Sequence, residues 1–146
     1  MNNETKWDSR FLQMASLVAT FSKDPSTKIG AVCADSKNRV LGVGYNGFSR
    51  NSKDDERLSV RETKYKLVIH AEHNCLMNCT SPTEGATVYV TLPPCLHCCG
   101  ILDQHGISRV VFAQPSPDFN RRWNMQETIE YLEELGIEVT TYRRIE

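Results

Sequence analysis

Apolar residues near the start of the chain recur at the spacing of an amphipathic helix. Within residues 7–21 they are Phe11, Met14, Ala15, Leu17, Val18 and Phe21. The segment Asp24-Pro25-Ser26 contains helix-breaking residues and is expected to end this helix. Two short apolar runs, 29–34 and 39–45, then flank a polar turn at 35–38, a pattern that predicts a β-hairpin.

The second half of the chain alternates between helical and strand patterns. Helices are predicted over 70–78, 95–104 and 125–135, and strands over 86–91, 107–113 and 137–142. With the first half, the order is α-β-β-α-β-α-β-α-β, which favours one mixed sheet flanked by helices, with parallel pairing in its second half. The polar residues 48–66 are expected to form a long loop with at most a short helix.

The composition is that of an ordinary folded domain. The 146 residues are 40% hydrophobic and 24% charged, with a formal net charge of −1, and they predict a single domain over 1–146. No stretch approaches the roughly 18 apolar residues of a membrane span, and the chain starts without an apolar signal region. We therefore expect a cytoplasmic protein with no membrane or nucleic-acid partner. In that compartment the six cysteines favour metal ligands and buried thiols over disulfides.

Two short motifs, His70-Ala71-Glu72 and Pro94-Cys95-Leu96-His97-Cys98, contain the residues of a metal site. His70, Cys95 and Cys98 are three candidate zinc ligands, and they leave a fourth position open for water, as catalytic zinc sites do. Both motifs fall at predicted helix starts, where free N–H groups and the helix dipole favour thiolates. Bound zinc would lower the pKa of a water molecule in this position.

Glu72 adds a carboxylate that need not bind the metal. Hydrolysis by a zinc-activated water needs protons moved from the attacking water to the substrate and to the leaving group, and one carboxylate beside the metal can transfer both. Residues two apart in the middle of a helix point to nearly opposite sides. His70 and Glu72 are therefore expected to straddle the irregular first turn of their helix.

Two further cysteines leave an alternative open. Cys75 and Cys79 have i,i+4 spacing and could join Cys95 and Cys98 in a closed four-thiolate site. That arrangement would describe a zinc-stapled binding module without catalysis. The simpler interpretation is that Cys75 and Cys79 are small buried apolar residues, and a structural site gives Glu72 no purpose.

The two motifs, with a strand between them, resemble the zinc-dependent cytidine/deoxycytidylate deaminase superfamily. Within it the chain is most similar to the deoxycytidylate (dCMP) deaminases, because Lys28-Ile29-Gly30-Ala31-Val32 and Gly44-Tyr45-Asn46-Gly47 also match. The resemblance covers nearly the whole chain. It implies a cytidine-deaminase-like three-layer α/β/α sandwich with a mixed five-stranded sheet.

The resemblance also implies the chemistry. It implies zinc on His70, Cys95 and Cys98, with Glu72 as the catalytic proton shuttle. The expected reaction is hydrolysis of dCMP to dUMP and ammonia, which would supply thymidylate synthesis. Deaminases acting on dCTP, cytidine or another cytosine nucleotide or nucleoside remain alternatives. A deaminase acting on tRNA is disfavoured because the sequence has no dense basic face.

Regulation and assembly are further expectations from the resemblance. Members of the family are usually hexamers, activated by dCTP and inhibited by dTTP, so we expect a homo-oligomer with an effector site. That site would use Gly44, Tyr45, Asn46 and Gly47. By the same resemblance, Asn46 and Ala71 are expected to contact the substrate.

One segment departs from the pattern of many relatives. Residues 48–68 contain no Cys or His, whereas many relatives carry ligands for a second, structural zinc there. We therefore predict one zinc ion per chain. The acidic run Asp54-Asp55-Glu56 in this segment could hold Mg²⁺ beside a bound nucleoside triphosphate.

The phosphate of a nucleotide needs local cations in a nearly neutral protein. The candidate contacts are Ser22, Lys28, Arg50, Arg57, Arg121 and Arg122. We expect Arg121 or Arg122 to bind the 5′-phosphate, because the planar guanidinium can contact two phosphate oxygens. Trp123 beside them could stack on the base or cover the pocket.

Overall fold

The computed structural model describes residues 5–115 and 124–143, and its strands form one five-stranded sheet in the order β2-β1-β3-β4-β5. The strands are β1 (Gly30–Ala34), β2 (Val40–Tyr45), β3 (Thr87–Val90), β4 (Arg109–Ala113) and β5 (Glu138–Tyr142). β1 pairs antiparallel with β2 and with β3, whereas β3, β4 and β5 are parallel. The predicted hairpin and the predicted parallel second half are both confirmed.

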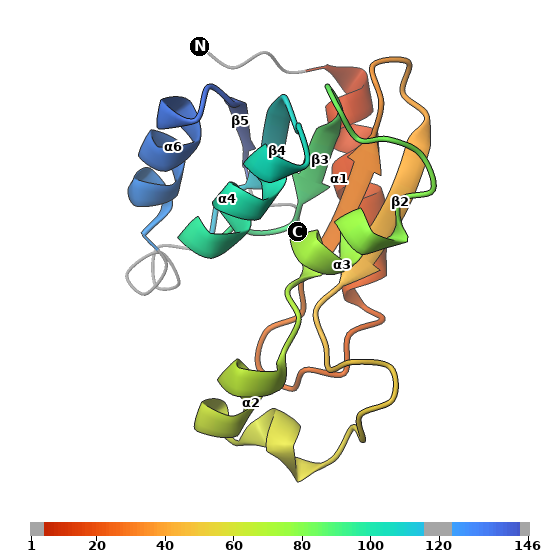
Figure 1. Cartoon of the computed structure of the whole chain (residues 1–146), viewed down its shortest axis with the longest axis vertical. Coiled ribbons are helices and arrows are strands. Elements are labelled where there is room, and N and C mark those ends of the chain that lie inside the picture. Colours follow the sequence, from red (N-terminus) through yellow and green to blue (C-terminus); the bar gives the residue numbers. More distant parts are fainter. Residues whose placement is uncertain (1–4, 116–123, 144–146) are drawn as a thin grey trace.

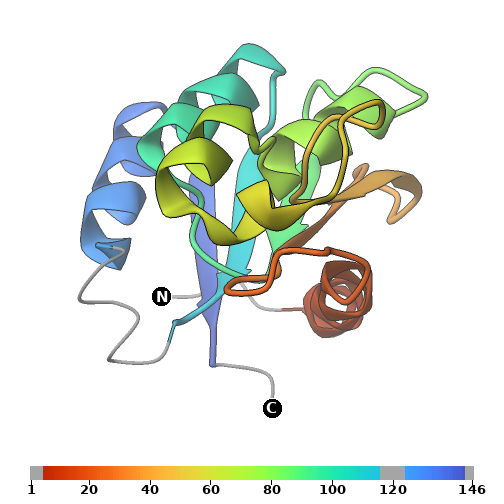
Figure 2. The same cartoon turned by 90° about the horizontal axis from the view of Figure 1, so that it is seen from below.

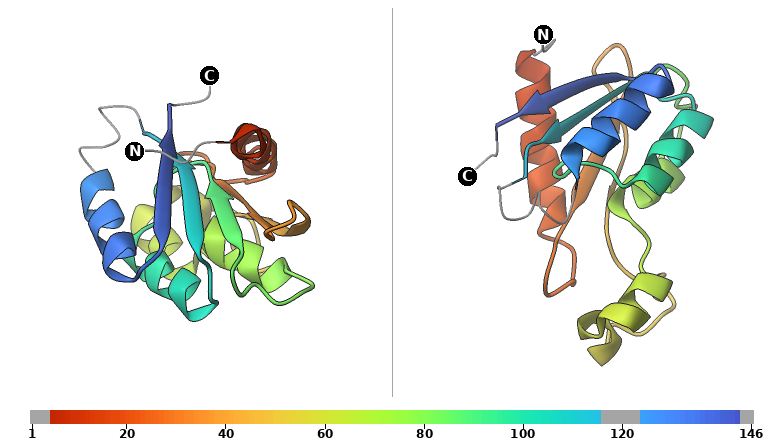
Figure 3. Two further views of the ribbon diagram at one scale, coloured as in Figure 1. Left: turned by 90° about the horizontal axis from the view of Figure 1, so that it is seen from above. Right: turned by 90° about the vertical axis from the view of Figure 1, so that its left-hand side faces the viewer.

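Helices cover both faces of this sheet. They are α1 (Lys6–Ala19), α2 (Arg61–Leu67), α3 (Ala71–Asn78), α4 (Leu96–Gln104) and α6 (Met125–Glu134), with a 3₁₀ turn, η1 (Glu56–Ser59). Figures 2 and 3 show α1 on one face and α3, α4 and α6 on the other. The predicted three-layer α/β/α sandwich is therefore confirmed. In the part of the chain that the structure describes, no helix is both long and apolar enough to span a membrane.

Alternation along the strands divides the core between the two faces. On β3, Tyr89 packs with Phe11 and Leu12 of α1, while Val88 and Val90 on either side of it belong to the layer beneath the other helices. The residues of that second layer contributed by helices include Leu76, Leu102 and Leu132. Because the sheet is covered on both faces, its central strands carry continuous apolar runs rather than alternating ones.

The polar segment after β2 is a long loop that contains short helical pieces, in line with the prediction of a loop with at most a short helix. These pieces are η1 and the two-turn helix α2, which runs to Leu67 and lies below the sheet (Figure 1). Asp55 caps η1 by accepting a hydrogen bond from the backbone of Arg57. An isolated antiparallel β-bridge between Gly47 and Ile69 joins the two ends of this segment. This helix lacks a periodic pattern of apolar residues, and tertiary contacts stabilise it instead. Such contacts cannot be predicted from the spacing of apolar residues.

The first helix is joined to the sheet by a buried ion pair. Asp8 forms a capping box with Thr5, and its carboxylate is fully buried. Arg109 on β4 donates to Asp8 Oδ1 at 2.9 Å and to Oδ2 at 2.6 Å, and also to the hydroxyl of Thr140 at 2.8 Å. Burial alone would raise the pKa of Asp8, but the hydrogen bond and charge of Arg109 hold it below the ordinary value of 3.8.

We predict that Asp8→Asn lowers the free energy of unfolding at pH 7 by about 3–5 kcal/mol, because Arg109 loses its buried partner. A carboxylate with a lowered folded pKa stabilises the protein above its unfolded pKa, and this contribution disappears as the pH falls through the folded pKa. The difference between the wild type and the variant should therefore shrink below the ordinary carboxyl value of 3.8. Urea unfolding at a series of pH values measures it.

The exposed pair between Lys23 and Asp54, 2.8 Å apart, supplies the control. Asp54→Asn should change the free energy of unfolding by less than about 1 kcal/mol, because exposed ion pairs are weak. Equal losses of unfolding free energy in Asp8→Asn and Asp54→Asn would show that the buried Asp8 pair stabilises the protein no more than an exposed pair.

Candidate metal centre and substrate pocket

The metal-site residues lie at one edge of the sheet, where two helices begin. β2 ends there at Tyr45 and β3 ends at Val90, while β1 starts at Gly30. His70 and Cys95 are the N-cap residues of α3 and α4, with extended backbones and no side-chain capping hydrogen bond. Their side chains are therefore available as metal ligands instead of caps.

The donor atoms of these residues are close enough to share one ion. The sulfurs of Cys95 and Cys98 lie 3.4 and 3.3 Å from Nδ1 of His70. Zinc–sulfur and zinc–nitrogen bonds at tetrahedral angles place such atoms about 3.5 Å apart. Within residues 5–115 and 124–143, His70, Cys95 and Cys98 are the group whose ligand atoms all lie within 4.8 Å of one another. The donor set thus fits zinc, with one coordination position left for water.

The protonation of the two thiols is also suited to a cation. A hydrogen bond from Cys98 has the largest effect on Cys95, and with the nearby His70 it lowers the pKa of Cys95 to about 4 despite burial. The same hydrogen bond and burial raise the pKa of Cys98. The pair therefore holds one proton between them, which a divalent cation would displace on binding.

Glu72 lies two residues after His70, in the first turn of α3, and is 4% exposed. Loss of solvent is the main cause that raises its pKa to about 7. Because the helix starts at Ala71, the extended His70 and the helical Glu72 can face the same site, as expected from the irregular first turn. A carboxyl with a pKa near neutrality suits general acid–base catalysis.

A cavity of about 580 Å³ opens beside this centre. Its lining residues are Asp24, Ser26, Thr27, Ile29, Asn46, Arg61, Lys64, Tyr65, Val68, His70 and Glu72. Its volume lies within the usual range for pockets that bind small molecules. The candidate metal ligand His70 and the carboxyl of Glu72 thus face one pocket large enough for a mononucleotide.

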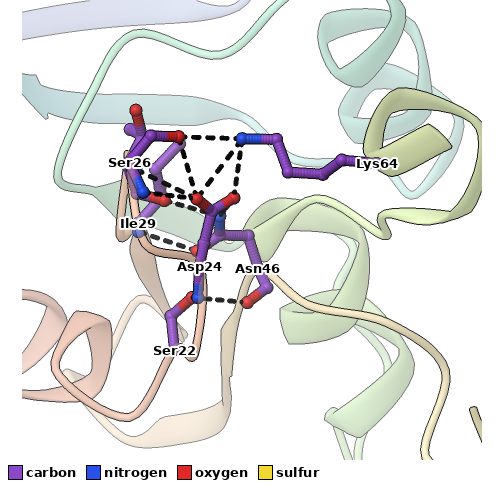
Figure 4. A network of polar contacts seen from close by, with 7 residues as sticks. Ser22, Asp24, Ser26, Ile29, Asn46 and Lys64 are labelled. Atoms are coloured by element: carbon purple, nitrogen blue, oxygen red, sulfur yellow. Dashed lines mark hydrogen bonds and ion pairs between the residues drawn. The ribbon is translucent and has the colours of Figure 1, made fainter. Parts of the chain in front are cut away.

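Asn46 organises the wall of this pocket, and Figure 4 shows its contacts. Its Oδ1 accepts a hydrogen bond from the backbone of Ile29 at 2.8 Å, and its Nδ2 donates to the carbonyl of Thr27 at 2.9 Å. Its own carbonyl accepts a hydrogen bond from the hydroxyl of Ser22. Asn46 lines the pocket as expected of a substrate contact, but its amide already binds the loop before β1.

Other expected substrate contacts have different positions. Ser22 is buried beneath the wall and holds Asn46, while Lys28 is exposed and lies outside the pocket lining. Ala71, the first residue of α3, is fully buried in the core between this helix and the sheet. Their predicted roles as direct contacts have no support in the lining of this pocket. Arg121, Arg122 and Trp123 lie outside the described residues.

The segment Gly44-Tyr45-Asn46-Gly47 has two distinct tasks. A Cβ atom on Gly44 would overlap the backbone nitrogen of Cys75, so this glycine allows α3 to pack closely on β2. Tyr45, Asn46 and Gly47 instead line a second cavity, of about 460 Å³, beside Lys23 and Arg50. Asn46 faces both cavities.

The alternative four-thiolate site does not form. Cys75 and Cys79 stand beside β2, where the Cys75 thiol contacts the carbonyl of Gly42 at 3.5 Å and the Cys79 thiol contacts the carbonyl of Cys75 at 3.3 Å. Neither belongs to the cluster of potential metal ligands found among the described residues. Cys75 is fully buried, as expected of a small apolar residue.

Two pocket cations, Arg61 and Lys64, were not among the predicted contacts. They lie three residues apart on α2, a spacing that places both on one face of a helix. The sequence signal was this i,i+3 pair of basic residues, and it was missed because the short helix allowed in this segment had no predicted position or face.

The profile described as "Cytidine and deoxycytidylate deaminase zinc-binding region" matches residues 5–114. The chain belongs to this family. The resemblance proposed from the motifs is thereby confirmed.

Several individual proteins with a similar sequence are named as deaminases. An "uncharacterized deaminase in luxG 3′ region" of Aliivibrio fischeri is 39% identical over 138 residues, which cover 93% of each chain. The human deoxycytidylate deaminase is 39% identical over 114 residues, which cover 73% of this chain and 64% of the human protein. The chain thus spans about two thirds of the length of the human relative.

Solved structures support the fold. The dCMP deaminase of cyanophage S-TIM5, in complex with dCMP and dUMP, aligns with a TM-score of 0.78 and 21% identity, covering 95% of this chain and 98% of that one. RibD of Acinetobacter baumannii aligns with a TM-score of 0.69 and 26% identity over 94% of this chain and 35% of that one. The cytidine-deaminase-like fold is therefore confirmed.

We predict that the purified protein contains one zinc ion per chain. Cys95→Ser should lose most of it, because one of only three protein ligands is replaced by a poorer donor. The double variant Cys75→Ala, Cys79→Ala should keep one equivalent, because these thiols do not reach the cluster. Elemental analysis of the folded proteins measures the metal directly.

The Cys75/Cys79 double variant decides between the two sites, because Cys95 is a ligand in both. Zinc lost from the double variant as well as from Cys95→Ser would favour the four-thiolate structural site. Two equivalents in the wild type would mean that a second site exists.

Proposed function

We propose that this protein is a deoxycytidylate deaminase that hydrolyses dCMP to dUMP and ammonia. The observation that carries the proposal is that Glu72 lines the same pocket as His70, which clusters with Cys95 and Cys98. A carboxyl beside an open zinc position has no task in a structural metal site. The choice of dCMP is supported by the names of the animal relatives and by the cyanophage enzyme.

His70, Cys95 and Cys98 would hold the zinc ion, which supplies a water molecule acidified enough to attack at neutral pH. The rest of the chemistry falls to Glu72. It accepts a proton from the attacking water and delivers it to N3 of cytosine as C4 becomes tetrahedral. It then takes the second proton from the new C4 hydroxyl and transfers it to the 4-amino group, so that the C4–N bond breaks, the C4 carbonyl forms and ammonia leaves. Its buried position keeps bulk water away from these transfers.

We propose that the second cavity binds a regulatory nucleotide, dCTP as activator or dTTP as inhibitor. Three of the four residues expected at an effector site line it, and Arg50 supplies positive charge, whereas Lys23 is paired with Asp54 of the same lining. Asn46 lines both cavities and holds the loop of the catalytic pocket, so an occupant of the second cavity would contact a residue that also shapes the first.

Other expectations remain predictions. They are a homo-hexamer, a cytoplasmic location, a supply of dUMP for thymidylate synthesis, and Mg²⁺ accompanying a bound triphosphate. Within the acidic run, Asp54 pairs with Lys23 and Asp55 with Arg57, which leaves less free charge for Mg²⁺ than the sequence suggested. Light scattering during gel filtration measures the assembly.

We predict that Glu72→Gln keeps its zinc but lowers kcat by at least about 10²- to 10⁴-fold, because the proton transfers lose their carboxylate. Glu62→Gln on the exposed side of α2 is the matched control and should retain wild-type kcat. Steady-state kinetics and zinc content are measured on the same samples. Activity close to that of the control would remove Glu72 from the mechanism.

A substrate panel tests the activity itself. The wild type should deaminate dCMP with a higher kcat/KM than dCTP, cytidine or deoxycytidine, and the rate at low dCMP should rise with dCTP and fall with dTTP. Release of ammonia is the common readout for all substrates. A preference for dCTP or a nucleoside would replace the proposed substrate, while unchanged rates with both effectors would reject only the regulation.

A further inference from the structure

The catalytic pocket has a cationic wall supplied by α2. Arg61 and Lys64 are the basic residues among those that line the pocket, and His70 and Glu72 line it as well. Their spacing puts both side chains on one face of the helix. One cavity therefore combines the reactive centre with two positive charges from a different element.

Lys64 is held in a preformed polar site. The residue is 9% exposed, and its Nζ donates to the hydroxyl of Ser26 at 2.8 Å and to Oδ1 of Asp24 at 3.3 Å (Figure 4). The backbone N–H groups of Ser26 and Thr27 also donate to Asp24, at 2.9 and 3.1 Å. Against the effect of burial, these hydrogen bonds and Lys64 keep the pKa of Asp24 below its ordinary value. Lys64 is thus a fixed ammonium paired with a fixed carboxylate.

Arg61 provides the charge that is not neutralised. Its side chain is exposed, and its Cζ lies 6.0 Å from the centroid of the Tyr65 ring. Among the described residues its guanidinium makes no ion pair within 4.0 Å. Since Asp24 balances Lys64, Arg61 leaves the α2 wall with a net positive charge and a free hydrogen-bonding fork.

We propose that Arg61 and Lys64 bind the 5′-phosphate of the substrate, an inference that rests on the proposed deamination of a nucleotide. The base and the phosphate lie at opposite ends of a mononucleotide, so a pocket that places cytosine at Glu72 must place the phosphate at another part of its wall. Arg61 clamps two phosphate oxygens through its planar guanidinium. Lys64 adds a preoriented N–H donor.

The neighbouring residues then have defined roles. Asp24 is a positioning residue, because it fixes Lys64 without itself touching the phosphate. Asn46 holds the carbonyl of Thr27 and the backbone of Ile29, and it thereby fixes the loop that carries Asp24 and Ser26. The phosphate site is in this way built from α2 and from the loop between α1 and β1. A nucleoside, which lacks the phosphate, would leave the positive charge of this site without a partner.

The first test is Arg61→Ala. The KM for dCMP should rise about 10- to 100-fold with kcat nearly retained, as expected for loss of one or two charge-assisted hydrogen bonds. Arg61→Lys should recover part of the loss, because it restores the charge but not the fork. Lys66→Ala is the matched control, since Lys66 is an exposed cation of the same helix outside the pocket lining.

The second test separates binding from folding at Lys64. Lys64→Gln should raise the KM for dCMP and also lower the thermal unfolding temperature, because Asp24 loses its charged partner. The double variant Lys64→Gln, Asp24→Asn removes the unpaired charge and should recover the unfolding temperature while the KM stays high. Recovery of both quantities would mean that Lys64 acts only on the fold.

The outcomes distinguish this inference from the proposed function. A wild type that turns over dCMP, with the KM unchanged in Arg61→Ala, overturns the phosphate site alone. An equal rise of KM in Lys66→Ala also overturns it, because the effect would then be a general loss of positive charge. A wild type without any dCMP turnover overturns the proposed function and removes the basis of the inference with it.

Discussion

The site depends on two helices that start at the same edge of the sheet. A helix start leaves N–H groups unpaired and gives its N-cap residue an extended backbone. In α3 and α4 these residues are His70 and Cys95, and their side chains make no capping hydrogen bond and are available to bind a metal. The first turn of each helix adds Glu72 and Cys98. Four functional side chains are thereby set by the positions of two short helices.

Close packing behind the site keeps these helix starts in place. Gly44 lets the backbone of β2 approach Cys75, and the amides of Asn74 and Asn78 donate to the carbonyls of Tyr45 and Val43 along the same strand. α3 therefore has little freedom to move relative to the sheet. Since the metal ligands must remain within a few tenths of an ångström of their positions, this rigidity serves the chemistry directly.

The periodic elements were predictable because their apolar positions record burial. The strands and the helices of the sandwich agree with the predicted ranges to within about two residues. The positions of η1 and α2 within the polar segment were not predicted, because these elements are stabilised by capping at Asp55 and by polar contacts of Lys64 instead of by an apolar face. The cations on α2 were overlooked for the same reason, and attention went instead to Lys28, which is exposed.

The sequence by itself indicated the candidate metal ligands and the candidate catalytic carboxyl, because their spacing places them at two helix starts. It also predicted the order of the layers, because the apolar periods record which elements are strands and which are helices. It could not decide which cations face the pocket, since that depends on contacts between residues far apart in the chain. Lys64 meets Asp24 across 40 positions, and Asn46 meets Thr27 across 19. Only the tertiary structure brings the loop before β1 and the helix after β2 together, and the polar end of the pocket lies between them.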